Sequence, residues 1–146
     1  MNMKNLFLLL VCGLCFQSVG SFAQGYKIQV NIPQMSNKQV ILANYFEGKV
    51  YAVDTAQINS NGTGYFQKNN KKLARGMYIL LFSPSNYFDI MIGDNQNFSI
   101  TTDTLQVIDK IRFEGSPENT AFLGFQKVMT SATQKSRQIK EAMEKD

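Results

Sequence analysis

The segment that most constrains the fold is residues 53–66, VDTAQINSNGTGYF, which has a run of turn-forming residues at its centre. Asn and Gly tolerate positive φ angles, and Asn or Ser side chains can bond their own backbone, so residues 59–64 favour a turn. Apolar and polar residues alternate on either side, which predicts a β-hairpin. We therefore expect an antiparallel β domain organised around this hairpin, and we expect Gly64→Val to destabilise it if Gly64 has a positive φ.

Segments of similar character recur along the chain. Residues 25–33 and 97–102 alternate, as half-buried strands do, with Phe98 and Ile100 pointing inward in the second. Residues 39–46 and 76–83 have longer apolar runs, so we expect the first to be buried on both faces and the second to be a central strand. The expected strands cover residues 25–33, 39–46, 49–54, 65–68, 76–83, 87–92 and 97–102, with one or two more within 105–113. This series predicts a mainly β fold over residues 24–115, an antiparallel sandwich or a barrel-like sheet.

The pattern changes to helical spacing in residues 116–146. Ser116 is a good N-cap, Pro117 a good first helical residue, and Glu118 suits the first turn. Apolar residues then recur on one side of the predicted helix at Phe122, Phe125, Met129, Ala132, Ile139 and Met143, with Ser136 filling the gap. We expect this helix to be the start of a truncated helical linker, to dock on another element or a second copy of the chain, or to end as a frayed helix packed on the sheet.

Residues 1–23 have the pattern of a secretory signal peptide. Lys4 precedes an apolar run over residues 6–16, and Ser21-Phe22-Ala23 resembles a cleavage site. The apolar run is too short to span a membrane, so we expect export to the periplasm or cell envelope. Cys12 and Cys15 fall inside the apolar run, and the residues before Cys12 disfavour a lipid anchor because Val stands where Gly or Ala is expected.

The composition of the remaining chain excludes several kinds of site. Residues 24–146 contain no Cys, His or Trp, which rules out Ser-His-Asp and Cys-His catalysis and a Cys/His zinc site. Of the 15 basic residues Lys4 is lost with the leader, which leaves 14 against 11 acidic residues. The basic residues are scattered and lack the interleaved aromatics of a nucleic-acid surface. We therefore predict no catalytic, cofactor-binding or metal-binding residues and no nucleic-acid partner.

Two other kinds of site can be weighed from the sequence. Paired carboxylates could hydrolyse glycosides, but the acidic residues lie in or beside turns and nothing brings two of them together. They are Glu47, Asp54, Asp89, Asp94 and Asp103. Exposed aromatic residues could instead bind a glycan or a peptide, although cross-strand packing explains them equally well. These residues are Tyr45, Tyr51, Tyr65, Tyr78 and Tyr87.

Short modification motifs are also present. Asn61-Gly62-Thr63 and Asn97-Phe98-Ser99 fit the N-glycosylation sequon. Thr55 and Thr104 lie in Asp-Thr-aliphatic triplets similar to O-glycosylation acceptors of Bacteroidota periplasmic proteins. The sequence alone leaves modification at these four positions open.

An ordered set of short motifs resembles one known family. The pieces are residues 26–32, Lys49-Val50-Tyr51 leading to Asp54-Thr55, Gly64-Tyr65-Phe66, Gly76-Met77-Tyr78-Ile79-Leu80, residues 98–101, and Gly115-Ser116-Pro117-Glu118-Asn119. Over residues 25–128 the chain resembles the β domain of unknown function found N-terminal to AhpC/TSA-type thioredoxin-like domains in exported Bacteroidota proteins. The thioredoxin-like domain and its Cys-x-x-Cys are absent from this sequence, and no redox residue is carried over.

This resemblance implies a non-catalytic N-terminal accessory domain of an exported thiol-disulfide oxidoreductase-like protein. Such a domain would position a redox domain or its partners, so the expected partners are a downstream thioredoxin-like domain or other envelope proteins. The alternative is a free-standing cell-envelope module that binds glycans or peptides through the aromatic residues of the sheet.

Overall fold

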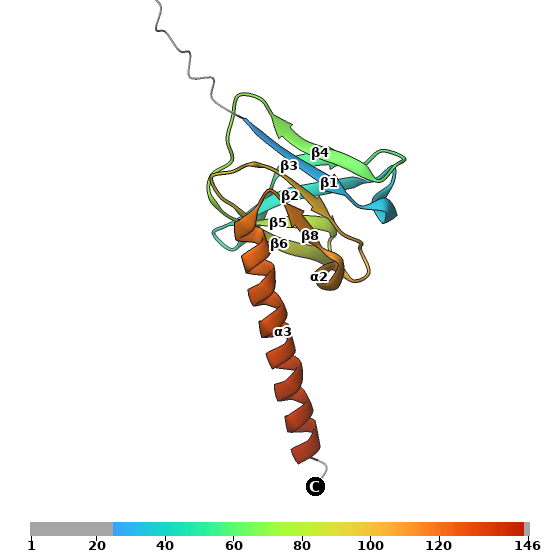
Figure 1. The fold of residues 1–146 in the computed structure, drawn as a ribbon, viewed down its shortest axis with the longest axis vertical. Coiled ribbons are helices and arrows are strands. Elements are labelled where there is room, and N and C mark those ends of the chain that lie inside the picture. Colours follow the sequence, from blue (N-terminus) through green and yellow to red (C-terminus); the bar gives the residue numbers. More distant parts are fainter. Residues whose placement is uncertain (1–24, 145–146) are drawn as a thin grey trace, which may run out of the picture.

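The computed structural model describes residues 25–144, and it consists of two four-stranded sheets with a long helix extending from them (Figure 1). The strands are β1 (Tyr26–Asn31), β2 (Gln39–Phe46), β3 (Lys49–Gln57), β4 (Thr63–Lys68), β5 (Gly76–Ser83), β6 (Asn86–Ile92), β7 (Asn97–Thr101) and β8 (Arg112–Glu114); the helical elements are η1 (Pro33–Met35), α2 (Val107–Lys110) and α3 (Pro117–Met143). The predicted mainly β fold followed by a C-terminal helix is confirmed. The predicted signal peptide, with Cys12 and Cys15, lies outside the described residues.

The two sheets differ in topology. One has the strand order β4-β1-β7-β8 and the other β3-β2-β5-β6. Neighbouring strands run antiparallel except β1 and β7, which pair in parallel from Lys27↔Asn97 to Asn31↔Thr101. The first sheet is therefore mixed, a feature that the prediction of an antiparallel domain did not include. The prediction of residues 76–83 as a central strand paired with residues 87–92 is confirmed by β5 and β6.

Alternating side chains of both sheets form one hydrophobic core. In β1 and β7 the inward residues are fully or nearly fully buried, Phe98 and Ile100 among them, as predicted. The opposite sheet contributes Leu42, Leu80 and Ile90. Burying a side chain of this size stabilises the fold by roughly 1.5–3 kcal/mol, so the core accounts for the association of the two sheets.

The predicted hairpin at residues 53–66 is wrong, because β3 and β4 belong to different sheets. Ile58 is fully buried, and the chain crosses the core at this point to pair with β1 instead of turning back on β3. The side chain of Asn59 accepts hydrogen bonds from the backbone N–H groups of Asn61 (2.9 Å) and Thr63 (3.0 Å), which stabilises the crossing. The turn residues were recognised correctly, but a buried side chain at the start of the turn favours a crossover between sheets.

Residues 105–113 contain one short strand, β8, preceded by the helical turn α2 and not by a further strand. Asp103 causes this difference, since its carboxylate accepts hydrogen bonds from the backbone N–H groups of Leu105 (2.9 Å) and Gln106 (2.7 Å). These contacts form a tight turn immediately before α2, in which a side chain takes the place of a strand as the partner of the backbone amides.

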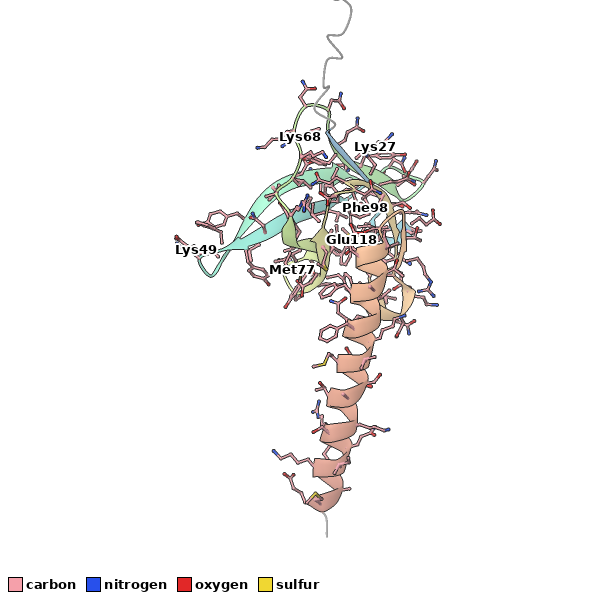
Figure 2. The ribbon with its side chains drawn as sticks, turned by 60° about the vertical axis from the view of Figure 1, so that its left-hand side comes forward. Lys27, Lys49, Lys68, Met77, Phe98 and Glu118 are labelled. Carbon is pink, nitrogen blue, oxygen red and sulfur yellow. The ribbon has the colours of Figure 1, made fainter. Side chains whose placement is uncertain are left out.

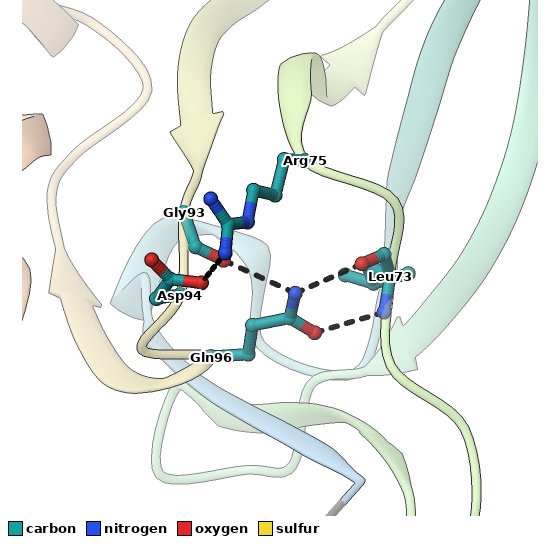
Figure 3. A network of polar contacts seen from close by, with 5 residues as sticks. All are labelled: Leu73, Arg75, Gly93, Asp94 and Gln96. Atoms are coloured by element: carbon teal, nitrogen blue, oxygen red, sulfur yellow. Dashed lines mark hydrogen bonds and ion pairs between the residues drawn. The ribbon is translucent and has the colours of Figure 1, made fainter.

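Two buried polar contacts join separate parts of the domain. The hydroxyl of Tyr26 donates a hydrogen bond to Asp54 Oδ2 (2.7 Å) and thereby links β1 of one sheet to β3 of the other. The side chain of Gln96 accepts a hydrogen bond from Leu73 N–H (2.8 Å) and donates to the carbonyls of Leu73 (2.9 Å) and Gly93 (3.2 Å), as Figure 3 shows. The contacts of Gln96 hold the connection before β5 against the turn between β6 and β7.

We predict that Gly64→Val destabilises the domain, although Gly64 does not have the positive φ on which the sequence-based prediction depended; Gly62 does (82°). A Cβ atom at Gly64 would lie 2.7 Å from Ile58 Cδ1 and 2.8 Å from the carbonyl oxygen of Gln57. The expected loss is about 1–3 kcal/mol in urea unfolding, as for an overpacked core. Gly124→Ala is the control, because its Cβ would meet no atom within 4 Å; equal stability of the Gly64→Val and wild-type chains would contradict the packing described.

A second prediction concerns the link between Tyr26 and Asp54. Burial, together with the hydrogen bond to Asp54 and its negative charge, raises the pKa of the Tyr26 hydroxyl. Because the folded pKa lies above the unfolded value of about 10, this stabilisation is fully present below about pH 10 and declines at higher pH. Tyr26→Phe should lower the free energy of unfolding by roughly 1–3 kcal/mol at neutral pH, and the difference from wild type should narrow above about pH 10.

Urea unfolding between neutral pH and the alkaline range measures this effect. Tyr78, whose pKa burial also raises, should contribute to the decline that remains in the Tyr26→Phe chain. A difference between the two chains that stays constant at all pH values would contradict the role given to Tyr26.

Candidate functional site: the outer face of one sheet

The outer face of the β4-β1-β7-β8 sheet is polar. Its strand register places Tyr65, Gln29, Ser99 and Glu114 in one row, and Thr63, Asn31, Thr101 and Arg112 in the next. Tyr65 is the one large aromatic residue in these rows, and the ammonium of Lys27 lies 5.2 Å from the centre of its ring. This face has the composition expected of a sheet that is exposed to water on one side.

The outer face of the β3-β2-β5-β6 sheet is apolar. One row across its four strands consists of Thr55, Ile41, Leu81 and Tyr87, and the next of Ala52, Ala43, Ile79 and Asp89. The pairs Val50–Tyr45 and Met91–Met77 extend the surface beyond this second row. We call these outward residues of the second sheet the apolar face. Figure 2 shows Lys27 and Met77 on opposite sides of the domain, with Met77 on the side from which α3 extends.

The apolar face is partly open to solvent. Tyr45 is 54% exposed, Tyr87 52%, Val50 48% and Met77 45%. Ile79 is only 2% exposed although it does not belong to the core cluster between the sheets. Contiguous exposed apolar surface of this kind marks an interaction site in soluble proteins. The apolar runs of β2 and β5 are long because each strand has one set of side chains in the core and the other set on the apolar face.

Asp89 is the one charged residue of the apolar face. It lies on β6, directly opposite Ile79, and partial burial raises the pKa of its carboxyl group. Within residues 25–144 the structure gives its side chain no hydrogen-bond or ion-pair partner. A carboxylate among apolar side chains loses hydration that a cationic group of a bound partner could replace.

A buried asparagine fixes the start of α3 on the edge of this sheet. Asn119 Oδ1 accepts a hydrogen bond from Met91 N–H (2.7 Å), and its Nδ2 donates to the Met91 carbonyl (2.7 Å) and to Ser116 Oγ (2.8 Å). Ser116 occupies the predicted N-cap position, but its hydroxyl accepts from this side chain and not from a backbone amide of the helix. Asn119 therefore satisfies the exposed main chain of the edge strand β6 and anchors α3 there.

Beyond its first turns α3 extends away from the sheets (Figure 1). Leu123 is buried in the core, whereas Phe125, Val128, Met129, Ile139 and Met143 are each at least half exposed. The predicted apolar stripe is thus present on the helix and uncovered along most of its length. We call it the α3 stripe; it consists of Phe122, Phe125, Met129, Ala132, Ser136, Ile139 and Met143.

The five tyrosines considered as a binding face do not come together. Tyr45 and Tyr87 lie on the apolar face, but Tyr65 is on the outer face of the other sheet. Tyr78 is buried in the core, where its hydroxyl donates a hydrogen bond to the Ala74 carbonyl (3.0 Å). Tyr51 packs edge-on against Phe46 near the tip of the β2–β3 hairpin, with ring centres 6.4 Å apart. Burial therefore explains Tyr78 and cross-strand packing explains Tyr51.

The candidate carboxylates are likewise dispersed, and three of them have local partners. Asp54 bonds Tyr26, Asp94 forms an ion pair with Arg75 (Figure 3), and Asp103 binds backbone amides before α2. Glu47 occupies the β2–β3 turn with a φ of 50°. In the part of the chain that the structure describes, no group of three or more Cys, His, Asp or Glu residues is arranged to hold a metal ion.

From the sequence, Asp89 was considered only as one of five candidate carboxylates, and the apolar character of the face around it was not recognised. The signal was present in residues 87–92, YFDIMI, where a single charge interrupts an apolar strand. Of the possible modification sites, Thr55 is exposed on β3 and Asn97 is exposed on β7. Among residues 25–144, no helix is long and apolar enough to cross a membrane.

Comparison with known proteins identifies a family for most of the domain. A family model described as "Domain of unknown function (DUF4369)" matches residues 26–122, a range that includes both sheets and the anchored start of α3. No curated protein matches the chain.

We predict that Asn119→Ala releases the start of α3 from β6. The substitution leaves the Met91 N–H and carbonyl without their partner, which should lower the free energy of unfolding by about 1–3 kcal/mol. Hydrogen exchange at the Met91 amide should also accelerate. Thr120→Ala is the neighbouring control, since Thr120 is exposed and its hydroxyl bonds only the Ser116 carbonyl; unchanged exchange at Met91 in the Asn119→Ala chain would contradict the anchoring role.

Proposed function

The chain belongs to the DUF4369 family, and on that basis we propose that it is a non-catalytic assembly domain of an exported thiol-disulfide oxidoreductase-like protein. In this proposal the domain positions a thioredoxin-like redox domain or its partners in the periplasm or cell envelope. The family description assigns no activity, so the proposal depends on the surface of the domain and on the sequence.

The observation that carries the proposal is the difference between the two outer faces. The β4-β1-β7-β8 sheet presents polar rows to solvent, whereas the β3-β2-β5-β6 sheet presents the apolar face. A sheet face that contacts only water is made soluble by polar residues, as the outer face of the other sheet is. Apolar surface on a single face supports a function in assembly.

Other features support the remaining parts of the proposal. Residues 24–146 contain neither Cys nor His, so thiol chemistry would belong to a partner domain. The leader-like residues 1–23 support export. The motif order described above supports association with a thioredoxin-like domain. A glycan- or peptide-binding module draws less support, because the tyrosines that would form its site are divided between faces.

The test is binding of the full chain to a purified thioredoxin-like domain from the same organism, measured by isothermal titration calorimetry. Tyr87→Lys places a charge on the apolar face, and Tyr65→Lys makes the same change on the polar outer face as a matched control. We expect wild-type and Tyr65→Lys chains to bind equally, and Tyr87→Lys to bind at least about tenfold more weakly, the loss of one well-packed interface residue.

Two results would count against the proposal. Absence of binding by the wild-type chain would refute the redox association. Equal binding by all three chains would show that the apolar face does not take part in the binding. Binding of a glycan or peptide that Tyr87→Lys abolishes would favour the alternative module.

A further inference from the structure

We infer that the apolar face of one chain is covered by the α3 stripe of a second copy, so that two chains form a reciprocal dimer with two sheet–helix interfaces. The inference relies on the proposed function only in treating the apolar face as an assembly surface. It names a second copy of the chain as the direct occupant of that surface, so that Tyr87→Lys would weaken binding of a redox domain by dissociating the dimer to which that domain binds.

The chain carries both halves of such an interface but does not join them within one copy. α3 is anchored at the edge strand β6 by Asn119 and then extends away from the sheets (Figure 1). The helix residues after Leu123 that make up its stripe are exposed, as are Tyr45, Met77 and Tyr87 of the apolar face. A second copy related by a two-fold axis can bring each stripe onto the other chain's face, because a two-fold interface is self-complementary.

The stripe is long enough to cover the apolar face. Residues 125–143 of α3 form a stretch of about 28 Å at 1.5 Å per residue. The rows of the apolar face run from Ile41 to Tyr45 on β2, which corresponds to about 13 Å at roughly 3.3 Å per residue. The exposed stripe therefore spans the apolar face and extends beyond it.

The buried area is sufficient for a stable dimer. The apolar face offers four large apolar side chains that are about half exposed, and the α3 stripe offers four that are at least half exposed. At on the order of 100 Å² for each, two reciprocal interfaces would remove up to about 1,600 Å² from water, which falls within the ~1,200–2,000 Å² of specific protein interfaces.

Charge also favours the sheet as the partner of the stripe. Lys135 and Lys140 flank the α3 stripe and are exposed, whereas Asp89 is the one charge on the apolar face. Docking the helix on the sheet allows a lysine to meet this carboxylate. Arg137, by contrast, is already paired with Glu141 on the helix (3.2 Å).

Charge also makes the pairing of two α3 helices less favourable. The stripe has the heptad spacing of a coiled coil, but a parallel pair would bring Lys135 close to the second copy's Lys140, two like charges. Ala132 and Ser136 also occupy two central seam positions, where larger apolar residues pack a coiled coil. A sheet surface can accommodate a shallow stretch of helix at these positions.

The test is the molar mass of the full chain by sedimentation equilibrium, with one exposed residue changed on each surface. Tyr87→Lys alters the apolar face and Met129→Lys alters the α3 stripe; Tyr65→Lys and Gln134→Lys are the matched controls on the polar sheet face and on the far side of the helix. We expect wild-type and control chains to be dimers, and each test variant to dissociate at least about tenfold more readily. Far-ultraviolet circular dichroism establishes that each variant is folded.

Mixing the two test variants gives a positive result that unfolding cannot mimic. Tyr87→Lys retains an intact stripe and Met129→Lys an intact apolar face, so an equimolar mixture should recover a dimer through one intact interface. Asp89→Lys should dissociate the dimer, and combining it with Lys135→Glu and Lys140→Glu should restore it.

Three results would overturn the inference. A wild-type monomer would refute it, and binding of that monomer to the thioredoxin-like domain would leave the proposed function intact. Sensitivity to Met129→Lys alone would indicate helix–helix pairing, and sensitivity to Tyr87→Lys alone would indicate sheet–sheet pairing. A dimer that behaves as expected but binds no redox domain would instead refute the proposed function and leave the inference standing.

Discussion

The start of α3 is fixed by Asn119, which pairs with both main-chain groups of Met91, and by Leu123, which is buried in the core. β6 is an edge strand, and its main chain at this residue would otherwise need water or another strand as a partner. The same contact sets where the helix leaves the β domain. Because the helix begins at the sheet edge and extends away, its apolar stripe and the apolar face both stay uncovered within one chain. An interaction local to the helix start thus determines which surfaces are available for assembly.

The two sheets perform different physical roles. Both contribute alternating residues to one core, and Tyr26 links them by its hydrogen bond to Asp54. On the outside, however, one sheet is polar and the other apolar. Only the second sheet has strands that are apolar at successive positions, as β2 and β5 are. Asp89 lies within this surface without a hydrogen-bond or ion-pair partner among residues 25–144, so its partial burial costs stability in the isolated chain.

The sequence predicted the mainly β class, the positions of most strands and the start of α3, because these depend on local periodicity and capping. The sequence did not predict the features that depend on which strands pair in the tertiary structure. Residues 53–66 have the composition of a hairpin, yet buried Ile58 directs the chain to the other sheet. The parallel pairing of β1 with β7 has no local signal at all. The apolar runs of residues 39–46 and 76–83 were noticed, but only the register shows that their second face points outward.

The central claim is that the apolar face contacts α3 of another copy, and site-specific photo-crosslinking measures this contact directly. A photoreactive phenylalanine at position 87 probes the apolar face, and the same group at position 65 probes the polar one; both native tyrosines are about half exposed, at 52% and 43%. We expect crosslinked dimers from position 87 whose second peptide lies within residues 125–143, and none from position 65. Equal crosslinking from both positions, or attachment from position 87 to any other part of the chain, would contradict it.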